Sequence, residues 1–280
     1  MAKPQISQGN PAPLTADEKE QNLRRLMREM QSVLVAYSGG VDSSYLALIA
    51  TQELGRRAVC ITGLSPSVSQ KQRDEAIKIA EDLNFNFKTI RTDEIENPLY
   101  RANPTNRCYH CKTELYDKLL SIAQKSEVEF VLDGANTDDV GDYRPGRQAA
   151  AEKGVRSPLI EVGLAKSEIR ELSKKHRLPT WNQPSSPCLS SRIAYGVPVT
   201  IERLSKVERG EEIVRSLGFR EFRVRVHDEL VRLEIAPVEL PRALDINVAE
   251  KLAEKFRRLG FKYVTLDLHG YRSGAMNEIL

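Results

Sequence analysis

The sequence has no continuous run of about 18 apolar residues, so it predicts no membrane span. Its first 15 residues are polar, contain three prolines and lack the apolar segment of a secretory signal. The net charge is only +3, from 42 basic and 39 acidic residues, which is not the clustered basic footprint of a nucleic-acid-binding protein. We therefore expect a cytoplasmic protein with no nucleic-acid partner and no membrane partner.

Cysteine and tryptophan are scarce, with four cysteines and one tryptophan among 280 residues. In a cytoplasmic chain, so few cysteines are more typical of ligands, catalysts or buried thiols than of disulfides. Cys60 lies in the apolar run 58–62 and is expected to be an inert thiol of the core. Trp181 is expected to pack between two domains.

A short glycine turn is the most informative motif that is present. Residues 38–43 read Ser-Gly-Gly-Val-Asp-Ser, between the apolar run 33–37 and the helical pattern 44–50. Glycines let the backbone approach a phosphate, and the free amides and positive end of the helix attract it. The spacing is not that of a Walker A loop. It resembles the pyrophosphate-binding motif of the PP-loop ATPases, which implies that ATP or pyrophosphate contacts Ser38, Gly39, Gly40, Asp42 and Ser43.

Strand and helix patterns alternate through the first two thirds of the chain. They predict strands at 33–37, 58–62, 87–90 and 130–132, and helices at 18–30, 69–83, 111–123 and 165–175. This alternation indicates an α/β fold, a parallel sheet with helices on both faces. Beyond residue 195 the predicted order is helix 201–217, strands 222–227 and 230–235, helix 248–259 and strand 263–268.

The change in element order divides the chain. We expect a disordered leader at 1–17, a PP-loop ATP-pyrophosphatase domain at 18–195, and a small α+β domain at 196–280 for substrate binding and oligomerisation. Loops at the carboxyl ends of parallel strands share one edge of the sheet. Gly63 and Gly134 therefore join the expected ATP site, and Asp138 and Asp139 are candidate Mg²⁺ ligands together with the nearby Asp142. The alternative is that these acidic residues only form turns.

Two cysteines lie three residues apart at the start of a predicted helix, in the segment Arg107-Cys108-Tyr109-His110-Cys111-Lys112. Both sulfurs can reach one metal or cluster, and a helix N-terminus is expected to lower the pKa of each thiol. The loop that contains Cys188 can return to the same place. Three cysteines suit a four-iron cluster with one open iron. The alternative is a zinc ion that staples the loop, which would take a histidine such as His110 or His227 as a further ligand.

An arginine pair is predicted on one face of the strand 222–227. Alternation places Arg223, Arg225 and His227 together on that face. Two neighbouring guanidinium groups suit a phosphate, so we expect Arg223 and Arg225 to bind the phosphate of a substrate. The alternative is a cross-strand ion pair with Glu234.

These motifs together resemble the ATP-dependent sacrificial sulfur transferases of the LarE type, within the PP-loop ATPase superfamily. The resemblance runs from Glu18 to Glu278, and its most specific parts are residues 38–43, 107–112, 133–139, 141–146, 187–192 and 271–274. It implies the PP-loop fold of adenine nucleotide α hydrolases, ATP and Mg²⁺ as cofactors, and a homo-oligomer. It also implies a catalytic carboxylate at Glu211 or Glu212, and Cys188 as the residue that delivers sulfur.

The resemblance further implies a reaction. ATP adenylates the carboxylates of pyridinium-3,5-biscarboxylic acid mononucleotide, and sulfur converts them to thiocarboxylates for the nickel-pincer cofactor of lactate racemase. One branch of the family sacrifices the sulfur of a single cysteine that matches Cys188. This sequence resembles the other branch, in which three thiolates, here Cys108, Cys111 and Cys188, hold a [4Fe-4S] cluster.

Two other functions compete with this one. A tRNA-thiolating PP-loop enzyme can also carry such cysteines, but the nearly balanced charge and the absence of an aromatic–basic platform argue against it. A non-enzymatic ATP-binding protein with a zinc-stapled loop would bind ATP without releasing pyrophosphate.

Overall fold

The central strand, β1 (Val33–Ala36), is apolar throughout and pairs in parallel with a strand on each side. The computed structural model describes residues 13–141, 144–184 and 186–272. In it, β1 lies between β2 (Ala58–Leu64) and β4 (Phe130–Leu132), and β2 also pairs with β3 (Asn86–Arg91). The four-stranded sheet has the order β3-β2-β1-β4 and is entirely parallel. The expected parallel sheet is thereby confirmed.

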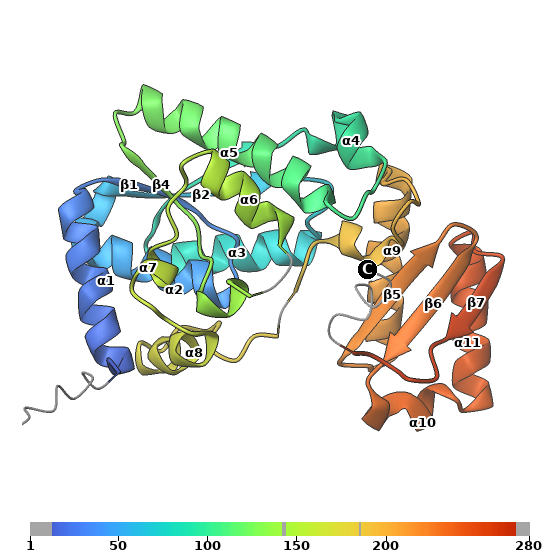
Figure 1. Cartoon of the computed structure of the whole chain (residues 1–280). Coiled ribbons are helices and arrows are strands. Elements are labelled where there is room, and N and C mark those ends of the chain that lie inside the picture. The colour runs from blue at the N-terminus through green and yellow to red at the C-terminus, as the bar shows by residue number, and fades with distance from the viewer. Residues whose placement is uncertain (1–12, 142–143, 185, 273–280) are drawn as a thin grey trace, which may run out of the picture.

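Helices cover both faces of this sheet, as expected (Figure 1). One layer packs against Val33 and Val35 of β1, and the opposite layer packs against Leu34. The first layer comprises α1 (Ala16–Met30), α2 (Val41–Leu54), α3 (Gln70–Asp82), α7 (Pro158–Glu161) and α8 (Lys166–Lys175). The second layer comprises α5 (Arg107–Lys125) and α6 (Pro145–Glu152). Because successive side chains of a strand point to opposite faces, β1 is buried from both sides.

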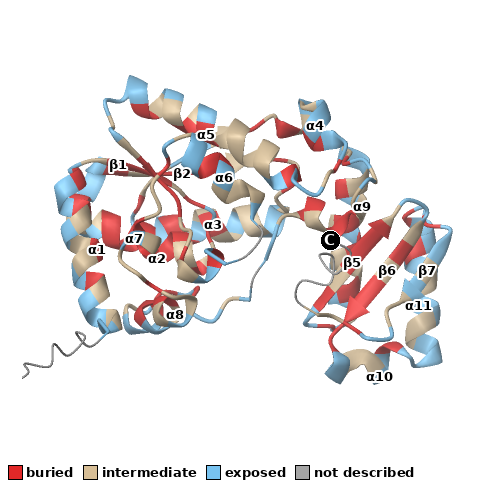
Figure 2. Ribbon diagram, in the orientation of Figure 1, coloured by how far each residue is buried: buried red, intermediate tan, exposed pale blue. Residues whose placement is uncertain are grey.

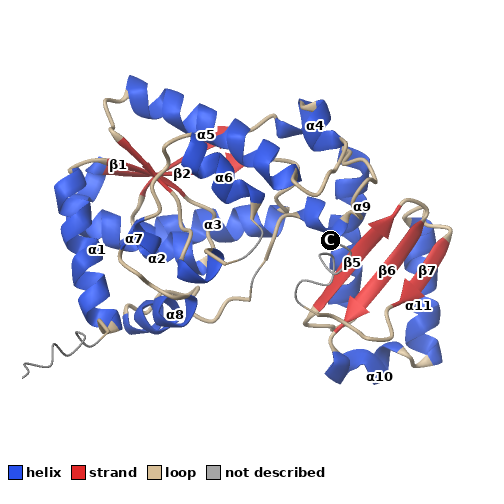
Figure 3. Cartoon of the chain, viewed as in Figure 1, coloured by secondary structure: helices blue, strands red, loops and turns tan. Residues whose placement is uncertain are grey.

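The small domain is a three-stranded sheet with helices on one face (Figure 3). Strands β5 (Phe222–His227) and β6 (Leu230–Ile235) form the expected antiparallel hairpin, and β7 (Tyr263–Leu266) runs parallel to β6. The alternate residues Phe222, Val224 and Val226 of β5 are buried in the second core, whereas Arg223 and Arg225 lie on the opposite face. The flanking helices are α9 (Ile201–Ser216), α10 (Leu240–Ala243) and α11 (Ile246–Arg258).

Residues 188–199 form a segment that runs from the first domain to the second. Leu189 and Ile193 of this segment, together with Tyr100 of α4 (Pro98–Arg101), are part of the core of the small domain. Strands β5 and β6 of this domain are largely buried (Figure 2). Ile193 also forms an isolated bridge with Val226 of β5. Five short 3-10 helices complete the described part of the chain: Gly55–Arg57, Glu94–Glu96, Thr137–Asp139, Leu189–Arg192 and Pro237–Glu239.

Some local expectations differ from the structure. The first helix begins at Ala16, two residues early and inside the expected leader, because Thr15 and Glu18 form a capping box. The helix expected to begin at Cys111 begins at Arg107, so both cysteines of the pair lie in its first turns. Trp181 does not pack between the domains, because its ring lies against Lys174 of α8 and 36% of the residue is exposed. Residues 1–12, Asp142 and residues 273–280 lie outside the described residues.

A buried carboxylate joins three helices of the first layer. Glu20 of α1 is 5% exposed and accepts hydrogen bonds from the Tyr45 hydroxyl (2.9 Å) and from Arg24, and its other close contact is His176 Nε2 (2.8 Å). Burial raises the pKa of Glu20, but its contacts with His176, Arg24 and Tyr45 outweigh burial and hold that pKa below its ordinary value. The ionised carboxylate therefore stabilises the fold.

This contact predicts a change in acid stability. Because the pKa of Glu20 is lowered by folding, its contribution is present above the ordinary value of 4.5 and is lost as the pH falls through the folded value. Glu20→Gln should lower the free energy of unfolding by about 2 kcal/mol at neutral pH, and this loss should shrink below about pH 4.5. Urea unfolding across this pH range measures the effect. The same substitution at the exposed Glu29 of α1 serves as the control, and equal losses for both variants would contradict the prediction.

Candidate active site

The glycine turn after β1 forms an anion cradle at the N-terminus of α2. Gly39 has φ +76°, and a Cβ there would lie 2.6 Å from Ala76 Cβ of α3, so only glycine fits. The hydroxyls of Ser38 and Ser43 are 2.9 Å apart across the turn, and Ser43 also donates to Gly40 O (3.2 Å). The turn thus presents two hydroxyls and the first amides of a 14-residue helix at one point.

The loop after β4 packs directly onto this cradle. A Cβ at Gly134 would lie 3.0 Å from the amide nitrogen of Ser43, so a side chain at Gly134 would crowd that amide. Gly63, at the end of β2, is required for a different reason. A Cβ at this position would lie 2.9 Å from Thr92 Cγ2 and 3.1 Å from Leu115 Cδ1. The structure therefore brings Gly134 to the cradle, and it explains Gly63 by packing between β3 and α5.

Two carboxylates converge beside the cradle. Asp42 Oδ2 accepts a hydrogen bond from Lys166 at the start of α8, and Asp42 Oδ1 is buried with no partner among the described atoms. Burial raises the pKa of Asp42, and the negative charge of Asp139 adds to the shift. Asp139 itself accepts from Arg144 (2.7 Å) and from the Asn136 amide (3.0 Å). A cation between Asp42 and Asp139 would relieve this repulsion, so these residues fit Mg²⁺.

Of the two expected magnesium ligands, Asp138 and Asp139, the geometry therefore favours Asp139 alone. Asp138 is exposed, whereas Asp139 is 8% exposed and lies close enough to Asp42 to influence its pKa. Lys166 was missed at the sequence level, because a lysine at the start of a predicted helix has no distinctive spacing relative to Asp42, 124 residues away.

The three candidate cysteine ligands approach one another. Cys108 and Cys111 lie in the first turns of α5, and Cys188 immediately precedes the 3-10 helix Leu189–Arg192. Desolvation raises the pKa of Cys108, and the negative charge of Cys188 adds to it. Burial, the Glu94 carboxylate and Cys188 likewise raise the pKa of Cys111. The expected lowering of both pKa values by the helix N-terminus is wrong, because desolvation and mutual repulsion outweigh the helix dipole.

The effect of negative charge at Cys188 on the pKa of Cys108 and of Cys111 indicates that the three sulfurs lie near one another. Among residues 13–141, 144–184 and 186–272, no three His, Cys, Asp or Glu side chains are close enough to hold a single metal ion. A four-iron cluster is wider than one ion, and its thiolate ligands lie farther apart around it. The three thiols, which each lose a proton on ligation, fit such a cluster. Cys60 is buried in β2, and burial raises its pKa to about 12, as expected for an inert core thiol.

Lys112 follows the cysteine pair and points into the same region. Its ammonium group lies 5.4 Å from the centre of the Tyr116 ring, and charges at Tyr116, Asp133, Cys111 and Cys108 raise its pKa. The sequence motif contained Lys112 but assigned it no role. Lys112 therefore has the cysteine pair on one side and Asp133, at the end of β4, on the other.

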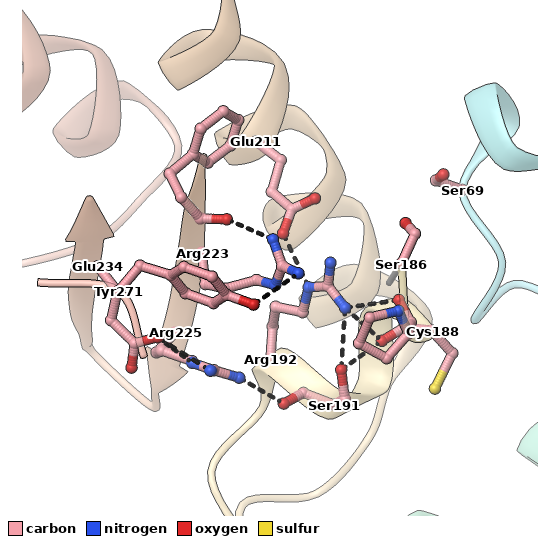
Figure 4. Close-up of polar contacts among 12 residues, drawn as sticks. Ser69, Ser186, Cys188, Ser191, Arg192, Glu211, Arg223, Arg225, Glu234 and Tyr271 are labelled. Atoms are coloured by element: carbon pink, nitrogen blue, oxygen red, sulfur yellow. Dashed lines mark hydrogen bonds and ion pairs between the residues drawn. The ribbon is translucent and has the colours of Figure 1, made fainter. Parts of the chain in front are cut away.

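Arg192 connects the Cys188 loop to the small domain (Figure 4). It is 2% exposed, its Nε pairs with Glu211 Oε1 at 2.8 Å, and its Nη1 donates to Cys188 O at 3.1 Å. In Figure 4 the sulfur of Cys188 points away from Arg192. Of the two candidate carboxylates, Glu211 faces the site, whereas Glu212 is exposed.

The arginine pair of β5 lies beside Arg192, but its two members have different surroundings. Arg225 is 6% exposed, pairs with the fully buried Glu234 (2.9 Å) and donates to Ser191 O (3.0 Å). Arg223 donates to the Tyr271 hydroxyl (3.2 Å) and lies over its ring. Burial and the charges of Arg192 and Arg225 lower the pKa of Arg223. The cross-strand pair with Glu234 thus exists for Arg225, while Arg223 is surrounded by two cations, Arg192 and Arg225, and by the carboxylate of Glu211.

The comparisons agree with this geometry. A family model described as NAD synthase matches residues 17–115. An uncharacterized protein of Synechocystis sp. is 44% identical over 265 residues, 94% of this chain and 98% of the relative. Pyridinium-3,5-bisthiocarboxylic acid mononucleotide synthase of Lactiplantibacillus plantarum is 35% identical over 267 residues, 95% and 96% of the two chains. An uncharacterized protein of Methanocaldococcus jannaschii is 32% identical over 243 residues, 87% of this chain and 92% of the relative.

The parallel sheet, the anion cradle and these matches define a PP-loop enzyme that uses ATP. Within that class, the chain belongs to the family of pyridinium-3,5-bisthiocarboxylic acid mononucleotide synthase, the LarE family. In the described part of the chain, no helix is long and apolar enough to cross a membrane.

The carboxylate pair predicts which aspartate supports metal binding. Asp42→Asn should remove most of the effect of Mg²⁺ on ATP affinity, about tenfold or more, because the buried acceptor Oδ1 becomes part of a neutral amide. Titration calorimetry with ATP, with and without Mg²⁺, measures this. Asp138→Asn is the matched control and should bind like the wild type. Loss of the Mg²⁺ effect in Asp138→Asn but not in Asp42→Asn would contradict this assignment.

Proposed function

We propose that this protein is an ATP-dependent sulfur transferase that forms AMP and pyrophosphate. Its substrate is pyridinium-3,5-biscarboxylic acid mononucleotide, whose carboxylates become thiocarboxylates during synthesis of a nickel-pincer cofactor. The proposal is supported by family membership and by one structural observation above all. The buried Arg192 binds the backbone of Cys188 and also pairs with Glu211, beside Arg223. A sulfur-bearing loop and a set of anion-binding arginines therefore belong to one site.

The first half of the reaction uses the ATP site of the nucleotide-binding domain. A substrate carboxylate oxygen attacks the α-phosphorus of ATP, the bond to the β-phosphate oxygen breaks, and pyrophosphate leaves. The amides at the start of α2 and the hydroxyls of Ser38 and Ser43 hold the departing anion. Asp42 and Asp139 would hold Mg²⁺, which would offset the negative charge of the phosphates. Lys166, which pairs with Asp42, keeps that carboxylate oriented.

The second half replaces the adenylate. A sulfur nucleophile attacks the acyl carbon, and AMP leaves with one of the original carboxylate oxygens, so that a thiocarboxylate remains. Cys108, Cys111 and Cys188 would hold a [4Fe-4S] cluster, which when bound would supply the sulfide. Lys112 lies beside Cys108 and Cys111 and would stabilise negative charge that accumulates there. The homo-oligomer and the cytoplasmic location stay predictions of the sequence.

The substrate phosphate is assigned to the arginines of β5. Arg225 already compensates Glu234, whereas the lowered pKa of Arg223 reflects burial and the charges of Arg192 and Arg225, which together outweigh the opposing charge of Glu211. A phosphate at Arg223 would offset this excess of positive charge. Arg225 stabilises the surroundings of that site, because it pairs with Glu234 and donates a hydrogen bond to Ser191 O.

This division of roles predicts different outcomes for the two arginines. Arg223→Ala should fold normally and bind the mononucleotide about tenfold or more weakly, because it removes one charge-assisted contact. Arg225→Ala should instead destabilise the protein by roughly 1–3 kcal/mol, because the fully buried Glu234 loses one of its two arginine partners and keeps only Arg232 (3.0 Å). Substrate titration by calorimetry and urea unfolding separate the two effects. A stable Arg225→Ala protein, or unchanged substrate affinity in Arg223→Ala, would refute the assignment.

The function itself is tested by product analysis under anaerobic conditions. With ATP, Mg²⁺ and the biscarboxylic acid mononucleotide, we expect pyrophosphate release and a product in which sulfur replaces a carboxylate oxygen. Cys188→Ala should still release pyrophosphate but form no thiocarboxylate, whereas Cys60→Ala, the matched control, should do both. A strict requirement for ammonia or for tRNA, or ATP binding with no pyrophosphate release, would reject this function.

A further inference from the structure

Cys188 lies on the segment that crosses between the domains, and two side chains of the nucleotide-binding domain hold that segment in place. Asn103 and Arg107 flank the turn between α4 and α5, four residues apart. Asn103 is fully buried and Arg107 is 4% exposed. Together they contact four backbone carbonyls of the crossing segment 188–199. None of these contacts involves Glu211, Arg223 or Arg225.

Asn103 makes three of these contacts. Its side-chain nitrogen lies 2.8 Å from Ala194 O, 2.8 Å from Val197 O and 3.3 Å from Ile193 O. An amide has two N–H groups, so one hydrogen is shared between two carbonyls. The amide oxygen accepts from Arg107, which fixes the orientation of the amide group because only its nitrogen can face carbonyls. The backbone oxygen of Asn103 also accepts from the Gly196 amide (3.0 Å).

Arg107 extends the same contact to the cysteines. Its Nη1 donates to Ser190 O at 3.0 Å, two residues after Cys188. The Ser190 hydroxyl lies 3.0 Å from Cys188 Sγ, so the residue that Arg107 holds is in contact with the thiol of the crossing segment. The next residue along α5 is Cys108 itself. A single side chain therefore connects the two parts of the chain that carry the candidate ligands.

We propose that Asn103 and Arg107 are positioning residues that hold Cys188 close to Cys108 and Cys111. Without these two side chains, the segment would keep three backbone hydrogen bonds to the nucleotide-binding domain, from Leu189 N to Ser67 O (2.7 Å), from Gly196 N to Asn103 O (3.0 Å) and from Val199 N to Arg101 O (2.8 Å). The carbonyls of Ser190, Ile193, Ala194 and Val197, which follow Cys188, would lose their side-chain partners. What the assembled thiols then do rests on the proposed function. The positioning itself concerns only where the three sulfurs lie.

A bifunctional thiol reagent tests this placement in reduced, metal-free protein. Dibromobimane becomes fluorescent when it bridges two neighbouring thiols, and peptide mass spectrometry identifies the pair. In the wild type we expect bridges between Cys188 and Cys108 or Cys111. Asn103→Asp keeps an acceptor for Arg107 but removes both N–H donors, so the rate of bridging should fall about tenfold as three carbonyls lose their partner.

Two further variants separate positioning from general stability. Asn84→Asp is the matched control, since Asn84 is exposed and also has a positive φ of 53°, as Asn103 has at 55°. It should form bridges like the wild type. Arg107→Gln should lose bridging, and Arg107→Lys should restore part of it, with thermal unfolding unchanged between these two. If Asn103→Asp fails to fold, the comparison of Arg107→Gln with Arg107→Lys tests the proposal instead.

Wild-type bridging rates in Asn103→Asp or in Arg107→Gln would overturn the proposal, as would a wild-type protein in which Cys188 forms no bridge to α5. These results are independent of the proposed function, because no iron, ATP or substrate is present. If the protein proved to bind no cluster, the bridging pattern would still decide whether Asn103 and Arg107 position Cys188.

Discussion

The site depends on the direct passage from the carboxyl end of β1 to the amino end of α2. β1 is buried from both sides, so its position is fixed by packing on two helical layers. The conformation of the turn that follows is fixed by close packing, because Gly39 lies against Ala76 of α3 and Gly134 lies against Ser43. The buried sheet thereby directs several backbone amides toward one point. These amides are already in position to bind an anion when no ligand is present.

Buried positive charges organise the rest of the site. Arg107, Arg192 and Arg225 are each no more than 6% exposed, and each has a hydrogen-bond partner in the segment 188–199. Buried cations are costly unless paired, so these arginines need the carboxylates and carbonyls that surround them. Negative charge at Cys188 raises the pKa of Cys108 and of Cys111, so metal binding, which removes the thiol protons, should depend on pH.

Sequence patterns located the elements well wherever the hydrophobic signal was strong. The strands 130–132, 222–227 and 230–235 have the predicted bounds, because apolar alternation and a two-residue turn define them locally. The short helices α4, α6, α7 and α10 were missed, since four to eight residues show too little periodicity.

The site was predictable only in part, for a related reason. A motif names the residues of one segment, as it did for Ser38–Ser43 and for the cysteine pair. It does not reveal contacts made between distant segments, such as Lys166 with Asp42 or Asn103 with Ala194. The choice between Glu211 and Glu212 required the actual rotation of α9, and the raised pKa of Cys111 required its burial.

The central claim is that Cys108, Cys111 and Cys188 act together as ligands of one cluster. The most direct measurement is iron and acid-labile sulfide per chain in protein reconstituted without oxygen, together with its EPR spectrum. We expect about four irons per chain, lost when any one of the three cysteines becomes alanine and retained in Cys60→Ala. Protein without iron, in which Cys188 loses the elements of hydrogen sulfide after exposure to ATP and substrate, would contradict this claim and show that the cysteine itself is consumed.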